Sequence, residues 1–566
     1  MDNAPGVPAE FGARALRGCV LALPVLLVLF TVPAAESPFL LPKRALLIAL
    51  SFALFAAAAA CRALRPLERT TALVLALLPA ACLISWLTSP RRDLGLDALL
   101  FVAAAPLLAW TAASVLRRDD AALLWVVAIA GAIEAAVVLL QWTSRLDVLG
   151  LFGYPAGAKG RMRLYGLAGN PDFAGIVMAA TLPPVLLLAR RAQGGRRYLL
   201  FAGAAVVGLA IAATGCRTAL AAAAVGIVAA TACDRAPSSR AARWMAALVV
   251  AAALLAATAW VRNPRPAGIA GRGRMFVSRV VLADAWKQAL GAGPGTFAYR
   301  YPRMLAAHLR VPRDLEEIVF AGYERTPNND FVQALSETGW LGLGALAILA
   351  GFLLMKLALP GTDPASSLVP AAALGSVAVL LTAGLAESPL QRAETWALLS
   401  LWLGLAVAAS APTRPAAVLA RPRFLALRFV VAAVLSAGVA AMAARAPRAS
   451  YWAAVGTRLE AQSHYAAAVD AYRRSIQIDP AASSAPFNLP RALAEVGDLD
   501  GATAAAIDGL RWIDEPELHL MRIRILEARG DYVAALQVAS EAAGTFPYSP
   551  SLRQEFLKLA SRLASH

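Results

Sequence analysis

The sequence predicts an all-α protein in two parts: a polytopic helical membrane bundle over residues 1–449 and a solenoid of helical repeats over 450–566. Of the 566 residues, 59% are hydrophobic, and the mean hydropathy of +0.61 exceeds that of ordinary soluble proteins. Apolar runs of spanning length recur to about residue 444. After Ser450, polar residues return and a pattern with a period near 34 residues appears.

Thirteen apolar runs are long enough to form membrane helices. The seventh and eighth are separated only by residues 214–217, so we expect about 12–13 spans. Many of the runs are rich in alanine, which favours helix and lets helices approach closely. The runs lie at about 15–33, 45–61, 71–88, 98–116, 121–141, 172–189, 198–214, 217–233, 243–261, 338–357, 368–387, 394–411 and 427–444.

The placement of arginines predicts the orientation of the bundle. With the N-terminus in the cytoplasm, the inner loops carry more arginines than the short outer loops, as the positive-inside rule requires. This orientation places the long loop at 262–337 outside. It also places the C-terminal repeats outside for thirteen spans, whereas an even number would place them in the cytoplasm. No convincing cleavage site follows the first apolar run, which we interpret as an anchored helix.

Charge and cysteine usage exclude several classes of function. The net charge is +17, but residues 450–566 hold eleven basic and fourteen acidic side chains, about −3, so the membrane part carries about +20. Most of these arginines are of the kind that sets topology, and there is no soluble basic domain to bind nucleic acid. The five cysteines lie in or beside apolar runs without CxxC spacing, so we expect neither disulfides nor a metal site.

The loop at 262–337 is the longest interruption of the membrane part. Between Arg262 and Asn328 it holds eleven basic and five acidic residues, mixed with aromatics and glycines. Loops of this length in compact proteins are usually functional or disordered, and this composition is unlike disorder. A basic, aromatic segment held against a bilayer favours an anionic, lipid-borne ligand.

Arginines at the ends of the predicted spans are the first candidate binding residues. Arg217 begins an apolar helix after a tight turn (TGCRTALAAAAVG), where the alternative is a lipid-facing anchor. Arg163 opens the block RLYGLAGNPDFAG, in which Asn170 or Asp172 can cap the next helix. Arginine suits a diphosphate, because its planar fork donates two hydrogen bonds at once and stays charged.

Within the long loop, Arg272 and Arg274 are the next candidates, followed by the glycine-rich block GAGPGTF at 291–297. In one interpretation, these glycines bring backbone amides close to a phosphate. The favoured interpretation is a plain turn without a ligand. Glu134 and Glu387 are isolated acids in predicted helices, for which a packed, hydrogen-bonded role is at least as well supported as catalysis.

Three segments of the C-terminal part align with one another: 463–480, 497–516 and 530–547. Each has an aromatic or leucine near its start, an alanine three residues later and a proline at its end, at intervals of 33 and 34 residues. This pattern resembles the tetratricopeptide repeat, in which pairs of helices stack and the small residue lies where helices cross. The functional interpretation is a concave surface that docks proteins, and the alternative is a structural appendage.

Four blocks in this order around a long outer loop resemble the O-antigen ligase and polymerase family of bacterial membrane glycosyltransferases: RLYGLAGNPDFAG, CRTALAA, GAGPGTF and NNDFVQALSETGWLGLG. The resemblance covers roughly residues 163–402 and implies a glycosyltransferase-C-like bundle in the inner membrane, with the repeats outside. It implies transfer of a glycan from undecaprenyl diphosphate to a glycan, lipid or protein acceptor in cell-envelope polysaccharide biosynthesis. It implies no cofactor and no metal. The family's diphosphate-binding arginines would correspond to Arg217 and to Arg274 or Arg272, with Arg163 as a further boundary arginine.

One position departs from the family pattern. The family places a presumed catalytic histidine where this chain has Asn328, and an amide is no general base. Either another group acts, with Asp330, Glu324 and His308 as candidates, or the chain has lost transfer activity. The alternative hypothesis is a non-catalytic membrane scaffold for surface-polysaccharide assembly that docks partners through its repeats. A transporter is a third class, disfavoured because no matching pair of broken helices is evident.

Overall fold

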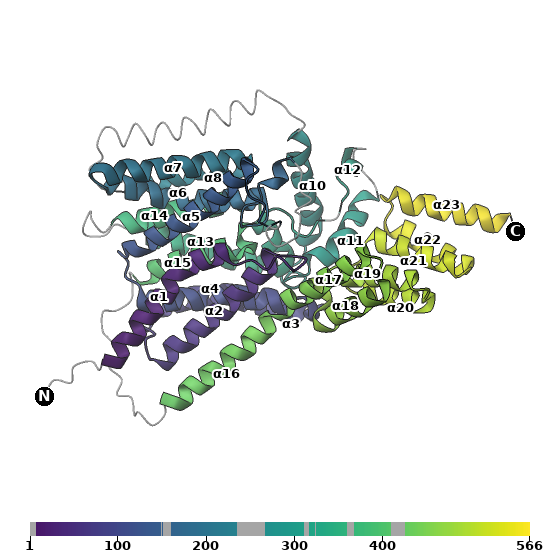
Figure 1. The fold of residues 1–566 in the computed structure, drawn as a ribbon, viewed down its shortest axis with the longest axis horizontal. Helices are drawn as coiled ribbons and strands as arrows, with labels where there is room; N and C mark the ends of the chain where they lie inside the picture. The colour runs from purple at the N-terminus through teal and green to yellow at the C-terminus, as the bar shows by residue number, and fades with distance from the viewer. Residues whose placement is uncertain are drawn as a thin grey trace.

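The computed structural model describes residues 7–148, 150, 160–234, 267–310, 316–322, 324–358, 367–408 and 425–565. Every regular element in these ranges is a helix. Figure 1 shows a bundle of long helices with a smaller group of short helices at one of its ends. We call that end of the bundle the repeat end, and the opposite one the far end.

Twelve of the thirteen predicted apolar helices are present, and the one expected at 243–261 lies outside the described residues. Among the described residues, nine helices are long and apolar enough to cross a membrane, and α8, α14 and α15 are shorter apolar helices. The apolar helices are α1 (Val7–Leu29), α2 (Leu40–Ala60), α3 (Arg69–Thr88), α4 (Leu96–Val115), α5 (Ala121–Trp142), α6 (Pro171–Arg191), α7 (Gly194–Thr214), α8 (Arg217–Cys233), α13 (Asp330–Ala358), α14 (Leu368–Ala383), α15 (Ala393–Ala408) and α16 (Leu425–Ala443).

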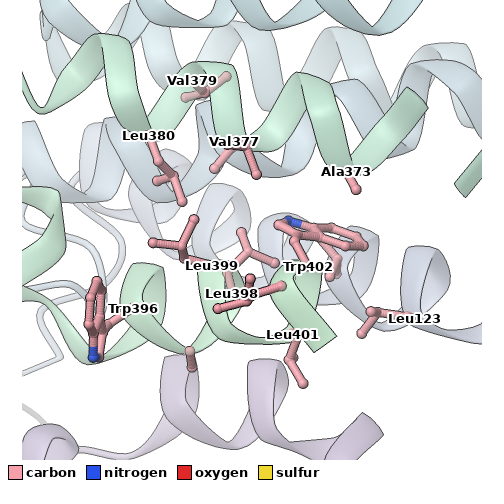
Figure 2. Packing of buried hydrophobic residues seen from close by; sticks show 14 of the residues in the cluster. Leu123, Ala373, Val377, Val379, Leu380, Trp396, Leu398, Leu399, Leu401 and Trp402 are labelled. Carbon is pink, nitrogen blue, oxygen red and sulfur yellow. The ribbon is translucent and has the colours of Figure 1, made fainter. Parts of the chain in front are cut away.

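The core of the bundle is built around α14, which packs against α6, α8 and α15. Figure 2 shows Trp402 of α15 turned toward Ala373 of α14, in a layer of buried leucines and valines. Helices α8 and α14 meet at Gly226 and Gly375, where a Cβ on Gly226 would come within 2.6 Å of the Gly375 carbonyl oxygen. Small residues therefore set the helix spacing, as the alanine-rich and glycine-containing runs predict.

The segment predicted as a long connection at 262–337 contains several short helices, which the sequence analysis did not predict. It holds α10 (Ala267–Ala285), α11 (Phe297–Leu309), α12 (Glu316–Val319) and the first turns of α13. These helices bury an apolar core of their own between α10, α11 and the start of α13, which makes the segment a packed subdomain; we call it the outer subdomain because its core is separate from that of the bundle. Its arginines mask this core in the sequence because they occupy the outward faces of short helices.

Helix α13 begins at Asp330 rather than near the predicted residue 338, and it is broken at Gly339. Gly339 has φ 66° and ψ −163°, a conformation that essentially only glycine adopts. A Cβ on Gly339 would lie 2.2 Å from the carbonyl oxygen of Ala289, so the chain also passes too close for a side chain. The first part of α13 therefore belongs to the outer subdomain and the second part to the bundle.

The C-terminal part forms a row of seven helices in which each packs against the next: α17 (Arg445–Ala461), α18 (Tyr465–Ile478), α19 (Ala485–Glu495), α20 (Leu499–Gly509), α21 (Pro516–Ala528), α22 (Tyr532–Thr545) and α23 (Pro550–Ala564). Ala468, Ala502 and Ala535 are fully buried at the helix crossings, which confirms the predicted helical repeat. The boundary predicted at 449/450 falls inside α17.

Direct bonds hold this repeat unit against the bundle and the outer subdomain. The amide of Ser484 donates to Glu36 Oε2 at 3.1 Å, and the amide of Ser37 donates to Ser450 Oγ at 2.9 Å. Arg303 of α11 forms an ion pair with Asp514 just before α21. The repeat unit therefore shares the repeat end with α10 and α11 (Figure 1).

Arginines lie at both ends of the bundle. The orientation prediction assigns these two ends to opposite sides of a membrane. At the far end, Arg17 pairs with Asp120 at 2.9 Å and Arg191 pairs with Asp234 at 2.5 Å. At the repeat end lies Arg274, in the segment that the orientation prediction places outside. The side of the membrane that each end faces stays a prediction.

Candidate functional site

Arg274 lies where three parts of the repeat end meet: helix α10, the start of α6 and the connection from α14 to the 3-10 helix η5 (Pro389–Gln391). Its Nη2 lies 2.5 Å from Glu387 Oε1 and 3.7 Å from Asp172 Oδ2. The Arg274 side chain is 34% exposed, whereas that of Glu387 is 3% exposed. A guanidinium that reaches solvent is thus held in place by a buried carboxylate behind it.

The starts of α6 and α8 form the next wall of the site. Asn170 caps α6 by accepting a hydrogen bond from the Asp172 amide at 2.8 Å, with Pro171 in the first turn, as predicted. The Asp172 carboxylate also lies close enough to the Cys216 side chain to interact with it. Cys216 is the N-cap of α8 and precedes the exposed Arg217, so α8 begins with Arg217 near the start of α6, whereas Arg274 contacts Asp172 directly.

The tight turn that precedes Arg217 is built as the sequence predicts. Helix α7 ends at Thr214, and Gly215 takes the left-handed conformation with φ 66°, which reverses the chain within two residues. The Cys216 Sγ then accepts from the Ala219 amide at 3.3 Å, so α8 starts at once. This geometry keeps Arg217 in the first turn of α8, beside the start of α6.

Glu324 and Asn328 lie in the linker that leads into α13, within electrostatic reach of Arg274. Burial raises the pKa of Glu324 above 4.5, although a hydrogen bond with the Asn328 side chain and the charge of Arg274 oppose this shift. Asn328 has a φ of 51°, which asparagine tolerates better than most residues. Sequence reasoning chose Arg274, Glu324 and Asn328 separately, and the structure brings them together.

Asp330, the third predicted catalytic residue, is buried and used in packing. Its amide donates to the Gly384 carbonyl at 2.9 Å, and its Oδ2 accepts from the Leu390 amide at 3.0 Å. Only 3% of the residue is exposed. Asp330 therefore fixes the connection that carries Glu387, which makes it a positioning residue and leaves Glu324 as the better-placed carboxylate.

The glycine-rich turn at 291–297 is occupied by protein groups. Its amides at Gly295 and Phe297 donate to the Glu337 carboxylate at 3.0 and 3.4 Å, and the Gly293 amide donates to the Glu337 carbonyl at 2.8 Å. These amides already have acceptors, so the plain-turn interpretation holds and the phosphate-binding alternative does not. The turn joins the outer subdomain to the broken helix α13.

The remaining candidates lie on other surfaces. Arg272 stands over the Phe320 ring at 5.9 Å, and Arg163 is exposed at the end of the 3-10 helix η3 (Gly160–Arg163). His308 packs its ring against Phe276, and its Nε2 lies 3.7 Å from Glu317, so it belongs to the core of the outer subdomain. Among the described residues, no group of three or more His, Cys, Asp or Glu side chains could hold a metal ion.

A second cluster of charges at the repeat end is closed to solvent, and of its members only Glu134 was a candidate in the sequence analysis. Lys43 is 1% exposed, and its Nζ lies 2.6 Å from Glu394 Oε1. The same ammonium donates to the carbonyls of Leu167 at 2.8 Å and Val28 at 3.1 Å. Lys43 is the fourth residue of α2, just before residue 45, where the predicted apolar run begins.

Glu134 and Arg392 complete this closed cluster. The Glu134 carboxylate accepts from the amides of Leu167 and Ala168 at 3.0 and 3.1 Å, which supports the packed role proposed for it. Arg392 donates to the Ala168 carbonyl and stacks on Phe173 at 4.5 Å. A charged residue inside an apolar run was the available signal for Glu134, and one at the edge of a run was the signal for Lys43 and Glu394.

Comparison with known proteins adds little to this description. No protein-family model matches the chain, and no curated protein matches it. Among solved structures, the chain is similar to one in the crystal structure of the APC/C hetero-tetramer Cut9–Hcn1, with 12% sequence identity and a TM-score of 0.19. That match covers 91% of this chain and 86% of the other. A similarity this low supports no argument about fold or function, so the helical repeat unit is established by its own geometry.

Proposed function

We propose that the protein transfers a glycan from a lipid diphosphate, such as undecaprenyl diphosphate, to an acceptor hydroxyl at the repeat end of the bundle. The observation that carries the proposal is the partly exposed Arg274, backed by buried Glu387, where an apolar bundle meets a polar subdomain. A lipid-borne diphosphate has its charge at this level, between its acyl chain and its sugar. The resemblance of the four sequence blocks gives the reaction class.

Arg274 is suited to bind the diphosphate. Its Nη2 contacts the carboxylates of Glu387 and Asp172, and the side chain is 34% exposed, so the guanidinium can be reached by a phosphate oxygen from the solvent side. Arg217, exposed in the first turn of α8, supplies a second guanidinium, and the start of α8 supplies the positive end of its helix dipole. Two arginines stabilise the charge that develops on the leaving diphosphate.

Glu324 is suited to accept the proton of the incoming hydroxyl. The acceptor oxygen forms a bond to the anomeric carbon as the bond from that carbon to the phosphate oxygen breaks. The diphosphate leaves with the electron pair, and the hydroxyl proton passes to the Glu324 carboxylate. Burial raises the pKa of Glu324 and so makes it a stronger base than an exposed glutamate. Asn328, hydrogen-bonded to it, orients this carboxylate in place of the family's histidine.

The acceptor decides between two forms of the reaction. A polymerase transfers to a second lipid-linked glycan, whereas a ligase transfers to a lipid core or a protein. The repeat unit stands beside the site, and helical repeats commonly dock proteins. We include the docking of protein partners by the repeat unit in the proposal.

A non-catalytic scaffold is the second candidate function. The observation that favours it is that Arg274 already has a buried carboxylate partner at 2.5 Å and that no histidine occupies position 328. A scaffold requires the repeat unit but not the site. Deletion of 450–566 would then abolish polysaccharide assembly, while Arg274→Ala and Arg217→Ala would leave it unchanged.

The test is transfer by the full-length protein in proteoliposomes that contain an undecaprenyl-diphosphate-linked oligosaccharide and either a lipid, a protein or a second lipid-linked acceptor. We expect Arg274→Ala and Arg217→Ala each to lower the release of undecaprenyl diphosphate by about 100-fold, the usual effect of losing one charge-stabilising donor. Arg279→Ala is the matched control, because Arg279 is exposed on the same helix α10. Normal transfer by the Arg274 variant would refute its assigned role.

A further inference from the structure

A cleft of about 590 Å³ lies between the bundle and the repeat unit, apart from the residues assigned to the proposed reaction. Its volume is in the range of ordinary small-molecule sites. The bundle contributes the connection between α3 and α4, with Trp86 and Asp97. The repeat unit contributes Arg445, Asp479 and Trp512 from α17, the 3-10 helix η7 (Pro480–Ala482) and the segment after α20.

Two tryptophans line the cleft, one from each part, and contacts fix both rings. Trp86 donates from Nε1 to the Arg92 carbonyl at 2.8 Å, and a Cβ on Gly95 would come within 2.6 Å of the ring. Trp512 lies under the guanidinium of Arg91, 5.4 Å from the ring centroid. Both residues are only partly buried, so each ring offers some of its surface to the cleft. Rigid aromatic surfaces with a polar edge bind ligands that are apolar on one face and polar at the rim.

The charges that line the cleft balance. Three carboxylates, Asp93, Asp97 and Asp479, stand with three guanidinium groups, Arg44, Arg92 and Arg445. Such a balance disfavours a phosphate, a nucleic acid or an anionic lipid headgroup, each of which needs an excess of positive charge.

Donors and acceptors lie next to each other in this set. Arg44 Nε lies 2.7 Å from Asp97 Oδ2, and Arg445 lies close enough to Asp479 to lower its pKa, although burial raises that pKa more. Ionised carboxylates only accept hydrogen bonds and guanidinium groups only donate them. A ligand that matches both kinds of group at neighbouring positions carries hydroxyls, each of which donates and accepts.

We propose that this cleft binds a neutral saccharide, with sugar faces against Trp86 and Trp512 and ring hydroxyls on Asp479 and Arg445. The cleft lies at the repeat end, and Arg44 and Ala98 line both the cleft and a smaller cavity that reaches Asp330. Its further role, as the subsite that holds the glycan chain of donor or acceptor, rests on the proposed function. Saccharide binding itself does not.

The test is binding of the full-length protein, in labelled lipid nanodiscs, to an array of neutral and acidic microbial glycans. We expect binding to a subset of the neutral glycans. Trp512→Ala removes one stacking surface and should weaken that binding at least about tenfold. Asp479→Asn keeps the side-chain oxygen that accepts from the Ala481 amide at 3.2 Å, so the fold is retained, and should also weaken binding about tenfold by removing the charge-assisted hydrogen bonds.

Trp452→Ala is the matched control, because Trp452 is a partly buried tryptophan on α17 that does not line the cleft. Unchanged binding in both Trp512→Ala and Asp479→Asn overturns the proposal. So does binding confined to acidic glycans, or no neutral glycan bound above empty nanodiscs. The array contains no lipid diphosphate, so the Arg274→Ala variant should bind the neutral glycans of the array normally. Failure of the transferase proposal therefore leaves the glycan-binding result unchanged. Likewise, failure to bind glycans in this cleft leaves the transferase proposal untouched.

Discussion

Two clusters of oppositely charged side chains lie at the repeat end. They differ in whether all of their charged groups are buried and paired within the protein. Around Lys43 and Glu394, each charged group is buried and its partners are other protein groups. Around Arg274, the carboxylate of Glu387 is equally buried, but the guanidinium is one-third exposed. The clusters are neighbours in the chain as well, since Glu387 precedes Arg392 by five residues. Similar residues at the same end of one bundle therefore make one closed cluster and one open one.

The difference teaches where to look for function in a bundle of apolar helices that also holds many charged residues. A closed cluster ties helices together, and its loss is a loss of stability. An open cluster retains hydrogen-bonding capacity toward a ligand, and its loss is a loss of binding or catalysis. Mutating matched residues in the two clusters tests this distinction directly.

The largest effect is expected from breaking the closed cluster. Lys43→Met leaves the Glu394 carboxylate buried without its 2.6 Å partner, which should cost about 3–5 kcal/mol of folding stability. Thermal unfolding in detergent, followed by intrinsic fluorescence, measures the loss. The double variant Lys43→Met/Glu394→Leu removes both charges and should recover much of it. An unfolding midpoint unchanged by Lys43→Met would show that the cluster is not structural.

The next effect concerns the proposed base of the open cluster. Glu324→Gln should lower transfer by about 100-fold or more, as expected for loss of a general base. In the unmodified protein, the pKa of Glu324 is raised above 4.5 by burial, so the carboxylate becomes protonated, and transfer falls, at a higher pH than for an exposed glutamate. The variant should lack this acid limb in a pH–rate profile. Glu317→Gln, in the same subdomain, is the control; an unchanged acid limb in Glu324→Gln would assign it to another group.

Glu387→Gln addresses the partner of Arg274. Removing a negative charge 2.5 Å from the guanidinium leaves more of its positive field for the ligand, so undecaprenyl diphosphate should bind about tenfold more tightly. Direct binding of the labelled lipid in nanodiscs measures this. Weaker binding would mean that Glu387 acts mainly by holding Arg274 in position. Glu394→Gln, the matched variant in the closed cluster, should instead lower the unfolding midpoint and leave the affinity for undecaprenyl diphosphate unchanged.

The smallest effect is expected in the repeat unit, where the Glu515 carboxylate is partly buried. Burial and the neighbouring Glu517 raise the pKa of Glu515 to about 7, and Arg325 opposes the shift. A carboxylate with a raised pKa binds its proton more tightly in the folded state, so stability falls as pH rises from about 4.5 to about 7. Glu515→Gln should therefore raise the unfolding midpoint at pH 8 and leave it nearly unchanged at pH 4. Glu541→Gln, exposed on α22, should do neither.

The helices of the bundle and the repeats were predictable because their signals are local. An apolar run of about twenty residues predicts a long helix, and Asn170 with Pro171 predicts where α6 begins. The outer subdomain was missed because its helices are shorter and carry arginines on their outer faces. In α11, Phe297, Tyr301 and Leu305 recur every four residues and are all buried, so a helical signal was present in the supposed loop.

The assembly of the site was not predictable from one sequence. Arg274 and Glu387 are 113 residues apart, and only tertiary structure pairs them. The same holds for Lys43 and Glu394, which lie 351 residues apart. Asn170 and Arg217 lie at helix starts, as the sequence predicts, whereas the carboxylate that pairs with Arg274 required the fold.

Gly339 affects how the bundle and the outer subdomain are positioned relative to each other. The chain passes through it in a conformation open only to glycine, with Ala289 directly against its Cα. Below this point α13 is anchored in the bundle, and above it the same helix presents Asp330 to the Leu390 amide. A methyl group here would collide with the Ala289 carbonyl, so the first turns of α13, which hold Asp330, would have to shift against the bundle. A single hydrogen atom in place of a side chain thus sets the alignment between the bundle and the subdomain beside it.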